Sequence, residues 1–184
     1  MEKQKIISPL DIVVLLRILM GKEEELSQNF LAEKLQLSQS EISKSLKRSR
    51  YSGLLVGSYQ VMKHPLIDFI QYGLKYAFPQ QPGAIVRGVP TAHSMSPLSE
   101  EISSGENYVW PYARGQMRGQ AIIPLYATAV QATLNDIKLH EQLALIDAVR
   151  VGRTRERNLA IQILRKDILD EEYKDQQNSY YTGS

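Results

Sequence analysis

The chain has 184 residues and contains no cysteine. This absence excludes a disulfide framework, thiolate metal sites and cysteine nucleophiles, and it suits the reducing cytoplasm. Histidine is also scarce, because only His64, His93 and His140 occur and they are scattered along the sequence. Such a set leaves little material for a zinc site. We therefore expect neither a metal nor a cofactor.

Long hydrophobic runs are missing as well. The apolar stretch from Ile12 to Met20 is interrupted by Arg17, whereas a membrane-spanning helix needs about 20 mainly apolar residues. The lysines near the N-terminus are not followed by a signal-peptide pattern with a small-residue cleavage site. We expect a soluble, cytoplasmic protein that has no membrane partner.

Catalytic motifs are absent too. The sequence has neither the phosphate-binding pattern GxxxxGK[ST] nor a dinucleotide-binding glycine fingerprint after a predicted strand. His93 lies beside Ser94 and close to Ser96, but neighbours in a chain rarely face one another, and no oxyanion glycine motif accompanies them. Glu100 and Glu101 fall in a polar loop, where solvated carboxylates are the default. We expect a binding protein rather than an enzyme.

The net charge of +2 is small, but charge is unevenly distributed. Between Ser38 and Lys63, five basic residues stand against the single acid Glu41, a local balance of +4. From Lys166 to the C-terminus, five acids stand against two lysines, a balance of −3. An anionic partner is therefore expected near the N-terminal basic stretch.

Helix signals are strong in the first third of the chain. Ser8 can cap a helix with proline at its first position, and apolar residues recur at helical spacing up to Gly21, which predicts a helix over residues 9–20. Ser27 can cap a second, short helix that ends near Gln36. A third helix is predicted over residues 39–52. Ser38 and Glu41 form a capping box at its start, and Gly53 ends it.

The segment from Phe30 to Leu46, FLAEKLQLSQSEISKSL, has the layout of a helix-turn-helix. This motif needs a small residue in its first helix, a tight turn, and apolar residues at fixed offsets that hold the helices at their angle. Ala32 supplies the small residue, and Leu35 and Leu37 bracket the turn. The inner face of the second helix carries Ile42 and Leu46, and its outer face carries Gln39, Ser40, Ser43, Lys44 and Lys47.

On these residues the segment resembles the motif of helix-turn-helix and winged-helix, MarR-like bacterial transcription regulators. In that family the second helix enters the major groove of DNA. The resemblance covers about twenty residues directly. The family's turn often carries a glycine where this chain has Gln36. The resemblance implies base contacts from Gln39, Ser40, Ser43 and Lys44, and phosphate contacts from Ser38, Lys47, Arg48 and Arg50.

A winged helix also has a β-hairpin, the wing, beside the second helix. One candidate is the short strand predicted over residues 54–61, which is where the family places its wing. The other is a hairpin predicted from strands over 108–112 and 120–125, whose turn carries Arg114 and Arg118. Sequence alone leaves the location of the wing open.

The rest of the chain is predicted to be mostly helical or irregular. A helix opens at His64 and closes before Pro79, and residues 80–104 are rich in turn signals. Two more helices, capped at Asn135 or Asp136 and separated by Gly152, form a helical hairpin. Tyr59, Trp110 and Tyr112 are interpreted as core aromatics rather than as the lining of a small-molecule pocket.

The segment from Asp147 to Arg157 concentrates charge where the two helices meet. One hypothesis is an anion-binding or partner-binding patch. The favoured interpretation is a helix corner stabilised by local ion pairs.

These patterns predict a mainly α fold with a small β component. Residues 1–79 are expected to form a winged-helix-like DNA-binding domain. Residues 80–170 are expected to form an irregular segment, a β-hairpin and a helical hairpin that serves dimerisation or partner binding, and residues 171–184 a mobile acidic tail.

The expected function is that of a sequence-specific regulator of transcription, a homodimeric repressor that binds double-stranded DNA. The alternative is a winged-helix module that binds another protein, as an antitoxin or a complex subunit does.

Overall fold

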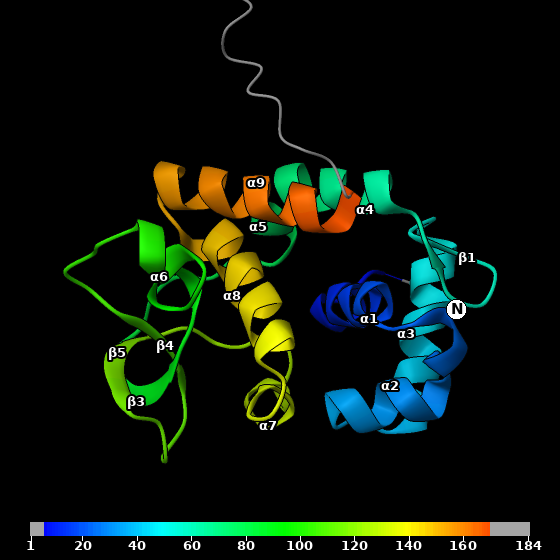
Figure 1. Ribbon diagram of the computed structural model, residues 1–184, viewed down its shortest axis with the longest axis horizontal. Helices are drawn as coiled ribbons and strands as arrows, with labels where there is room; N and C mark the ends of the chain where they lie inside the picture. Colours follow the sequence, from blue (N-terminus) through cyan, green and yellow to red (C-terminus); the bar gives the residue numbers. More distant parts are fainter. Residues whose placement is uncertain (1–5, 170–184) are drawn as a thin grey trace, which may run out of the picture.

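Helices dominate the fold. The computed structural model describes residues 6–169, and within this range five strands form two small sheets. Figure 1 shows the two sheets at opposite ends of the molecule, with helices between and above them. The expected class, mainly α with a small β component, is confirmed.

The first helix, α1 (Pro9–Met20), lies in the middle of the molecule and has the predicted bounds (Figure 1). The residues from Ile12 to Leu16 are at most 2% exposed. A helix that is apolar on all sides is buried on all sides. It packs against three helices: α2 (Gln28–Leu35), α3 (Gln39–Tyr51) and α8 (Ile137–Val151).

The next two helices confirm the sequence prediction. After α1, the 3₁₀ turn η1 (Glu23–Glu25) leads to α2, which Ser27 caps by accepting a hydrogen bond from the N–H of Phe30 at 3.1 Å. Gln36 ends α2 with left-handed backbone angles, φ 56° and ψ 46°. This non-glycine residue therefore adopts the positive φ that the tight turn before α3 requires.

Residues 54–61 fold as a β-hairpin instead of a single strand. Strands β1 (Leu55–Val56) and β2 (Gln60–Val61) pair antiparallel. Gly57 lies in the turn between them with φ 57°, a conformation that costs glycine little and other residues more. The hairpin follows α3 directly and β1 packs against that helix.

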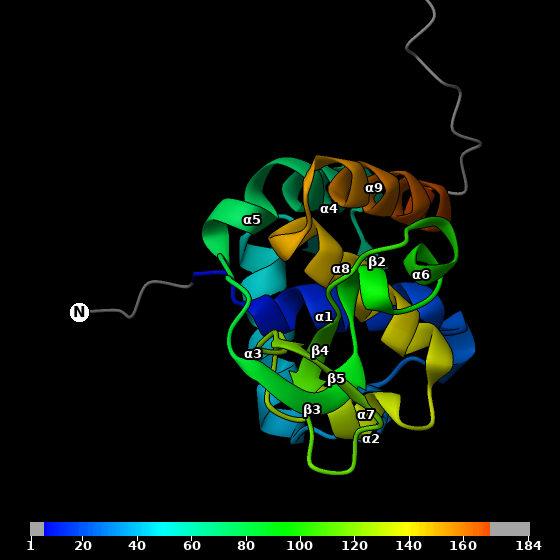
Figure 2. The ribbon, with the colours of Figure 1, turned by 90° about the vertical axis from the view of Figure 1, so that its left-hand side faces the viewer.

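The following segment is helical from Lys63 to Ala77. It consists of α4 (Lys63–Asp68), the π-helical turn η2 (Phe69–Gly73) and α5 (Leu74–Ala77), which confirms the helix predicted before Pro79. In Figures 1 and 2, α4 lies beside the last helix, α9 (Thr154–Leu169), and the two are in contact.

A small closed barrel occupies the other end of the molecule from β1 and β2 (Figure 1), and it faces the viewer in Figure 2. Its strands are β3 (Ile85–Pro90), β4 (Tyr108–Pro111) and β5 (Met117–Ala121). Strand β3 pairs antiparallel with both of the others, whereas β4 and β5 pair parallel.

The predicted hairpin between residues 108 and 125 is therefore wrong. Strand β3, in a segment whose prolines and glycines predicted loops, pairs with β5 through its first half and with β4 through its second half. Gly88 is shared by both pairings, and a Cβ atom on it would overlap the backbone carbonyl of Trp110. Two short helical segments separate β3 from β4: η3 (Ala92–Ser94) and α6 (Leu98–Glu101).

The C-terminal helical hairpin is confirmed. Asp136 caps α8 by accepting a hydrogen bond from the N–H of Leu139 at 3.0 Å, and α9 packs along α8 after the break at Gly152. A short helix before it, α7 (Ala129–Thr133), was not predicted. Buried residues of both predicted domains belong to one hydrophobic core, and the predicted tail, residues 171–184, lies outside the described residues.

Between residues 6 and 169, none of the helices combines the length and apolar character that crossing a membrane requires.

Candidate nucleic-acid interface

The start of α3 is fixed by a reciprocal cap. Ser38 Oγ accepts a hydrogen bond from the N–H of Glu41 at 3.2 Å, and Glu41 Oε2 accepts one from the N–H of Ser38 at 2.9 Å. Ser38 Oγ also donates to the same carboxylate at 2.8 Å. These bonds from Ser38 favour the ionised carboxylate and lower the pKa of Glu41. The capping box predicted from the sequence is therefore present, and both side chains are used by it.

The turn between α2 and α3 is held from the C-terminal half of the chain. Thr128 Oγ1 lies 3.2 Å from the carbonyl oxygen of Leu35 and 3.1 Å from that of Gln36, and donates to these two acceptors. Thr128 is the N-cap residue of α7, and α7 packs against α2 (Figures 1 and 2). The angle at which α3 leaves the turn is thus fixed by packing that no local pattern reveals.

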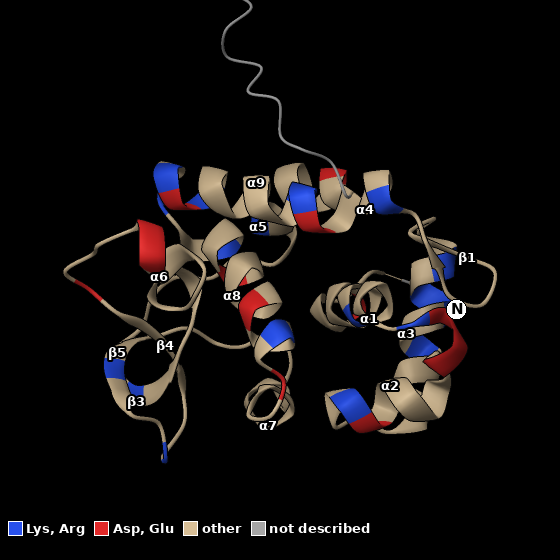
Figure 3. Cartoon of the chain, in the orientation of Figure 1, with Lys and Arg blue, Asp and Glu red and all other residues tan. Residues whose placement is uncertain are grey.

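One face of α3 is buried and the other is open. The buried residues recur at helical spacing and anchor the helix: Ile42, Ser45, Leu46 and Ser49. The residues predicted to contact bases or phosphates lie on the other side. Gln39, Ser40, Lys44 and Lys47 are exposed, and Ser43 is half-buried. In Figure 3, Lys and Arg residues (blue) occur at several positions along α3.

The amide of Gln39 is held against α2. Its Nε2 donates to Oδ1 of Asn29 in a short hydrogen bond. Both residues are exposed, so the pair lies at the surface where α2 and the start of α3 meet.

Arg48 has an internal partner. Its Nε and Nη2 atoms donate to the two carboxylate oxygens of Asp11 at 2.8 and 2.6 Å, and Nη2 also donates to Ser8 Oγ at 3.1 Å. The Asp11 side chain is 0% exposed and that of Arg48 is 24% exposed. This bidentate pair fastens α3 to the start of α1, so the guanidinium predicted to contact phosphate is already engaged.

Arg50 connects α3 to the hairpin. Its Nε donates to the carbonyl oxygen of Gly57 at 2.6 Å, and its Nη2 donates to that of Ser58 at 3.1 Å. Both acceptors lie in the turn between β1 and β2. Arg50 is exposed, so its remaining N–H groups face solvent while the side chain positions the hairpin beside the helix.

The second candidate wing does not lie beside α3. Arg114 lies in the loop that follows β4 and Arg118 lies on β5, and this barrel is at the far end of the molecule from α3 (Figure 1). Because β4 and β5 pair parallel, the loop between them is not the tip of a hairpin. The hairpin that contacts α3 is β1–β2.

The charged segment from Asp147 to Arg157 points partly into the core. Asp147 accepts hydrogen bonds from Thr91 Oγ1 at 2.8 Å, Trp110 Nε1 at 2.6 Å and Arg150 Nη1 at 2.8 Å. Burial raises the pKa of Asp147, and these donors oppose that rise. The ion-pair interpretation fits Asp147 and Arg150, although their pair is buried where an exposed one was expected.

His93 is buried, and its Nδ1 lies 3.8 Å from Oε2 of Glu156. Its Nε2 lies 2.7 Å from the carbonyl oxygen of Glu106, and its ring packs edge-on against Tyr108 with centroids 4.6 Å apart. Ser94 Oγ accepts from the N–H of Tyr108, and Ser96 Oγ donates to Glu100, so neither hydroxyl is paired with the imidazole.

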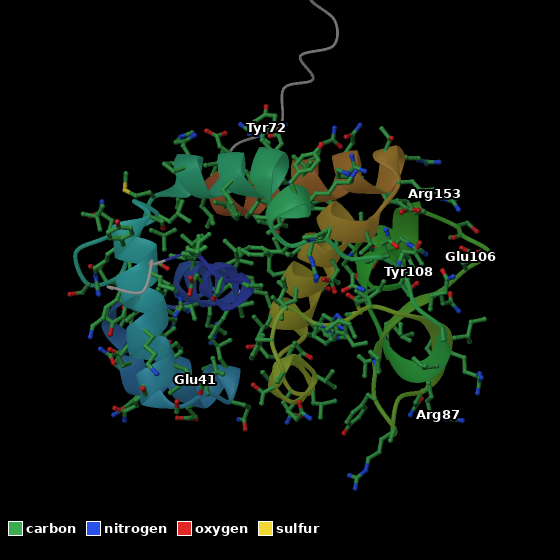
Figure 4. The ribbon with its side chains drawn as sticks, turned by 180° about the vertical axis from the view of Figure 1, so that it is seen from behind. Glu41, Tyr72, Arg87, Glu106, Tyr108 and Arg153 are labelled. Atoms are coloured by element: carbon green, nitrogen blue, oxygen red, sulfur yellow. The ribbon has the colours of Figure 1, made fainter. Side chains whose placement is uncertain are left out.

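Figure 4 shows Tyr108 close to Glu106 and Arg153 at one edge of the molecule. Burial, together with the charges of Glu156 and Glu106, raises the pKa of Tyr108. The direction is that of a phenol moved out of water, because burial disfavours the phenolate form.

No family model, no curated protein and no solved structure matches this chain. Function is therefore inferred from the geometry of α2, α3 and the hairpin.

Proposed function

We propose that this chain binds double-stranded DNA by inserting the exposed face of α3 into the major groove, as a sequence-specific transcription regulator. One observation carries this proposal. Helix α3 is capped at its start, anchored by its buried face, preceded by a tight turn and followed by a hairpin, yet its outer face carries polar and basic side chains. These features support a winged helix-turn-helix, the motif that the sequence resembles.

The proposed base contacts come from the first half of α3. Gln39, Ser40, Ser43 and Lys44 carry amide, hydroxyl and ammonium groups that can hydrogen-bond to base edges. Gln39 already donates to Asn29, so it must exchange that bond for one with a base. Sequence preference is assigned to these four residues because phosphate contacts carry no sequence information directly.

The proposed phosphate contacts come from Lys47 and Arg50. Lys47 is exposed with no ion pair among residues 6–169. Arg50 retains N–H groups beyond those donated to the hairpin turn. We leave Arg48 out of the contact set because Asp11 holds its guanidinium, and Ser38 because its hydroxyl serves the cap.

The hairpin β1–β2 takes the place of the wing in this proposal. Residues 54–61 contain no charged side chain, so the hairpin would meet DNA through backbone N–H groups and through Arg50 at its turn. Repression is the simplest consequence of such binding. A protein bound at an operator blocks it by occupancy alone, and no enzymatic activity is required.

Selection from a random duplex pool tests the proposal. The purified protein is incubated with the pool at roughly 50 and 200 mM salt, and bound sequences are recovered and read. A complex that depends on phosphate contacts weakens steeply over this range. Enrichment of a sequence supports the proposal, and a palindrome with half-sites about one DNA turn apart would indicate the homodimer.

Variants identify the helix that reads the DNA. Lys47→Ala is expected to weaken all sequences and to reduce the slope of log affinity against log salt by about one, whereas Lys44→Ala is expected to change the enriched sequence. Lys166→Ala, on the exposed side of α9, removes the same charge and serves as the control. If all three variants have the same DNA affinity, salt dependence and enriched sequence, or if no salt-sensitive binding is seen at the lower salt, α3 is excluded as the helix that contacts DNA.

A further inference from the structure

Two arginines of the barrel lie directly opposite each other on paired strands. Arg87 on β3 and Arg118 on β5 are directly opposite in the antiparallel pairing, so their side chains project from the same face of the sheet, with Cβ atoms about 4.5–5.5 Å apart. Both are exposed, and neither forms an ion pair within the described range 6–169. Like charges in this position destabilise a sheet, so an anion bound between them would remove an unfavourable interaction.

The three strands of the barrel contain no acidic residue, and the acid nearest to them in the chain, Glu106, forms no ion pair with Arg87, Arg114 or Arg118 within residues 6–169. Residues 69–99 and 107–135, which contain all three strands, include no Asp or Glu but do include Arg87, Arg114 and Arg118. The nearest following acid, Asp136, is used to cap α8. Figure 3 shows Lys and Arg colour on β3, β5 and the loop below them, and Figure 4 shows Arg87 projecting outward from the barrel.

A cavity of about 400 Å³ opens beside these arginines. Val89, two residues beyond Arg87 and therefore on the same face of β3, lines it. Arg87 Nη1 also donates to the carbonyl oxygen of Gly115, another lining residue, at 3.3 Å. The apolar wall of the cavity consists of Val89, Pro90, Met117 and Leu134. Tyr112 contributes an aromatic ring and Arg114 a guanidinium group.

We propose that the barrel binds a nucleotide. The cavity volume is within the range of roughly 300–1,000 Å³ that is typical of small-ligand sites. Its apolar wall and Tyr112 suit a base, which can stack on an aromatic ring. Arg87, Arg114 and Arg118 suit the phosphates, because guanidinium groups bind phosphate oxygens in bidentate fashion. This proposal does not depend on DNA binding by α3, which lies at the other end of the molecule.

Binding of an ATP analogue with a fluorescent N-methylanthraniloyl group on its ribose tests the proposal by anisotropy. The double variant Arg87→Gln/Arg118→Gln is expected to weaken binding by at least tenfold, since about that factor accompanies the loss of a charge-assisted hydrogen bond. The control Arg155→Gln/Lys166→Gln removes two charges from exposed positions on α9 and is expected to leave binding unchanged. Undiminished binding by the first variant, or equal weakening by both, would overturn the proposal.

Two further measurements distinguish nucleotide binding at the barrel from general binding of phosphate and from binding at α3. Inorganic tripolyphosphate is expected to compete much less well than ATP, and equal competition would show that the apolar cavity is not used. Lys44→Ala/Lys47→Ala is expected to leave nucleotide affinity unchanged, and a loss there would place the phosphates on α3 instead. The melting temperature of the Arg87→Gln/Arg118→Gln variant should stay close to that of the wild type, because the loss of like-charge repulsion offsets the loss of the hydrogen bond from Arg87 to the Gly115 carbonyl.

Discussion

Replacing Arg48 by alanine separates a structural role from a role in DNA binding. Asp11 is 0% exposed and loses the two hydrogen bonds of its ion pair in this variant, retaining only the bond from the N–H of Ser8. Removing one partner of a buried ion pair costs about 3–5 kcal/mol. Because the Arg48 side chain is 24% exposed, solvent screens the pair, and we expect a loss of about 2–3 kcal/mol in the free energy of unfolding.

Urea unfolding measures this loss, and Lys47→Ala on the same helix is the control. We expect the control to change the free energy of unfolding by less than about 0.5 kcal/mol, because Lys47 is exposed. DNA binding should show the opposite pattern. Lys47→Ala should reduce the slope of log affinity against log salt by about one, while Arg48→Ala, measured under conditions in which it is folded, should leave this slope unchanged. The reasoning is refuted if Arg48→Ala unfolds at the wild-type urea concentration and reduces the salt slope.

Three further outcomes follow from contacts elsewhere in the fold. Arg50→Ala removes the two hydrogen bonds to the β1–β2 turn, so amide exchange over residues 55–61 should become faster while α3 stays protected. Gly88→Ala places a Cβ against the Trp110 carbonyl, so the melting temperature should fall by several degrees, as expected for about 2 kcal/mol or more. Burial lowers the pKa of His140, so the unfolded chain binds the proton more tightly and stability should fall as pH drops below about 6.5. Urea midpoints at several pH values test this, and His140→Gln should reduce the loss of stability just below about pH 6.5.

The N-terminal helices could be predicted because their signals are local. Ser8 and Pro9 mark the start of α1, and Ser38 with Glu41 marks the start of α3, so residues at most three positions apart determine each boundary. The barrel could not be predicted in the same way. Its pairings join β3 to strands about 20 to 35 residues away, and the prolines and glycines of the β3 segment are typical of loops.

The outer face of α3 followed from helical spacing, but the roles of its arginines did not. The partner of Arg48 is Asp11, 37 residues earlier in the chain, and no local pattern distinguishes this buried pair from a solvent-exposed arginine. The partner of Arg50 is a backbone carbonyl, which carries no sequence signal. Side-chain identity therefore predicted which residues carry positive charge, and only the tertiary structure shows which of them are already engaged.

Helix α7 connects the two proposed sites. Leu134, its C-cap residue, lines the cavity beside the barrel. At its other end, Thr128 donates to the carbonyl oxygens of Leu35 and Gln36 in the turn before α3. A ligand in the cavity changes DNA affinity only if α7 has two conformations and the ligand binds the protein more tightly in one of them. If nucleotide in the cavity shifts α7, it changes the support of the turn, and DNA must then change nucleotide affinity by the same factor.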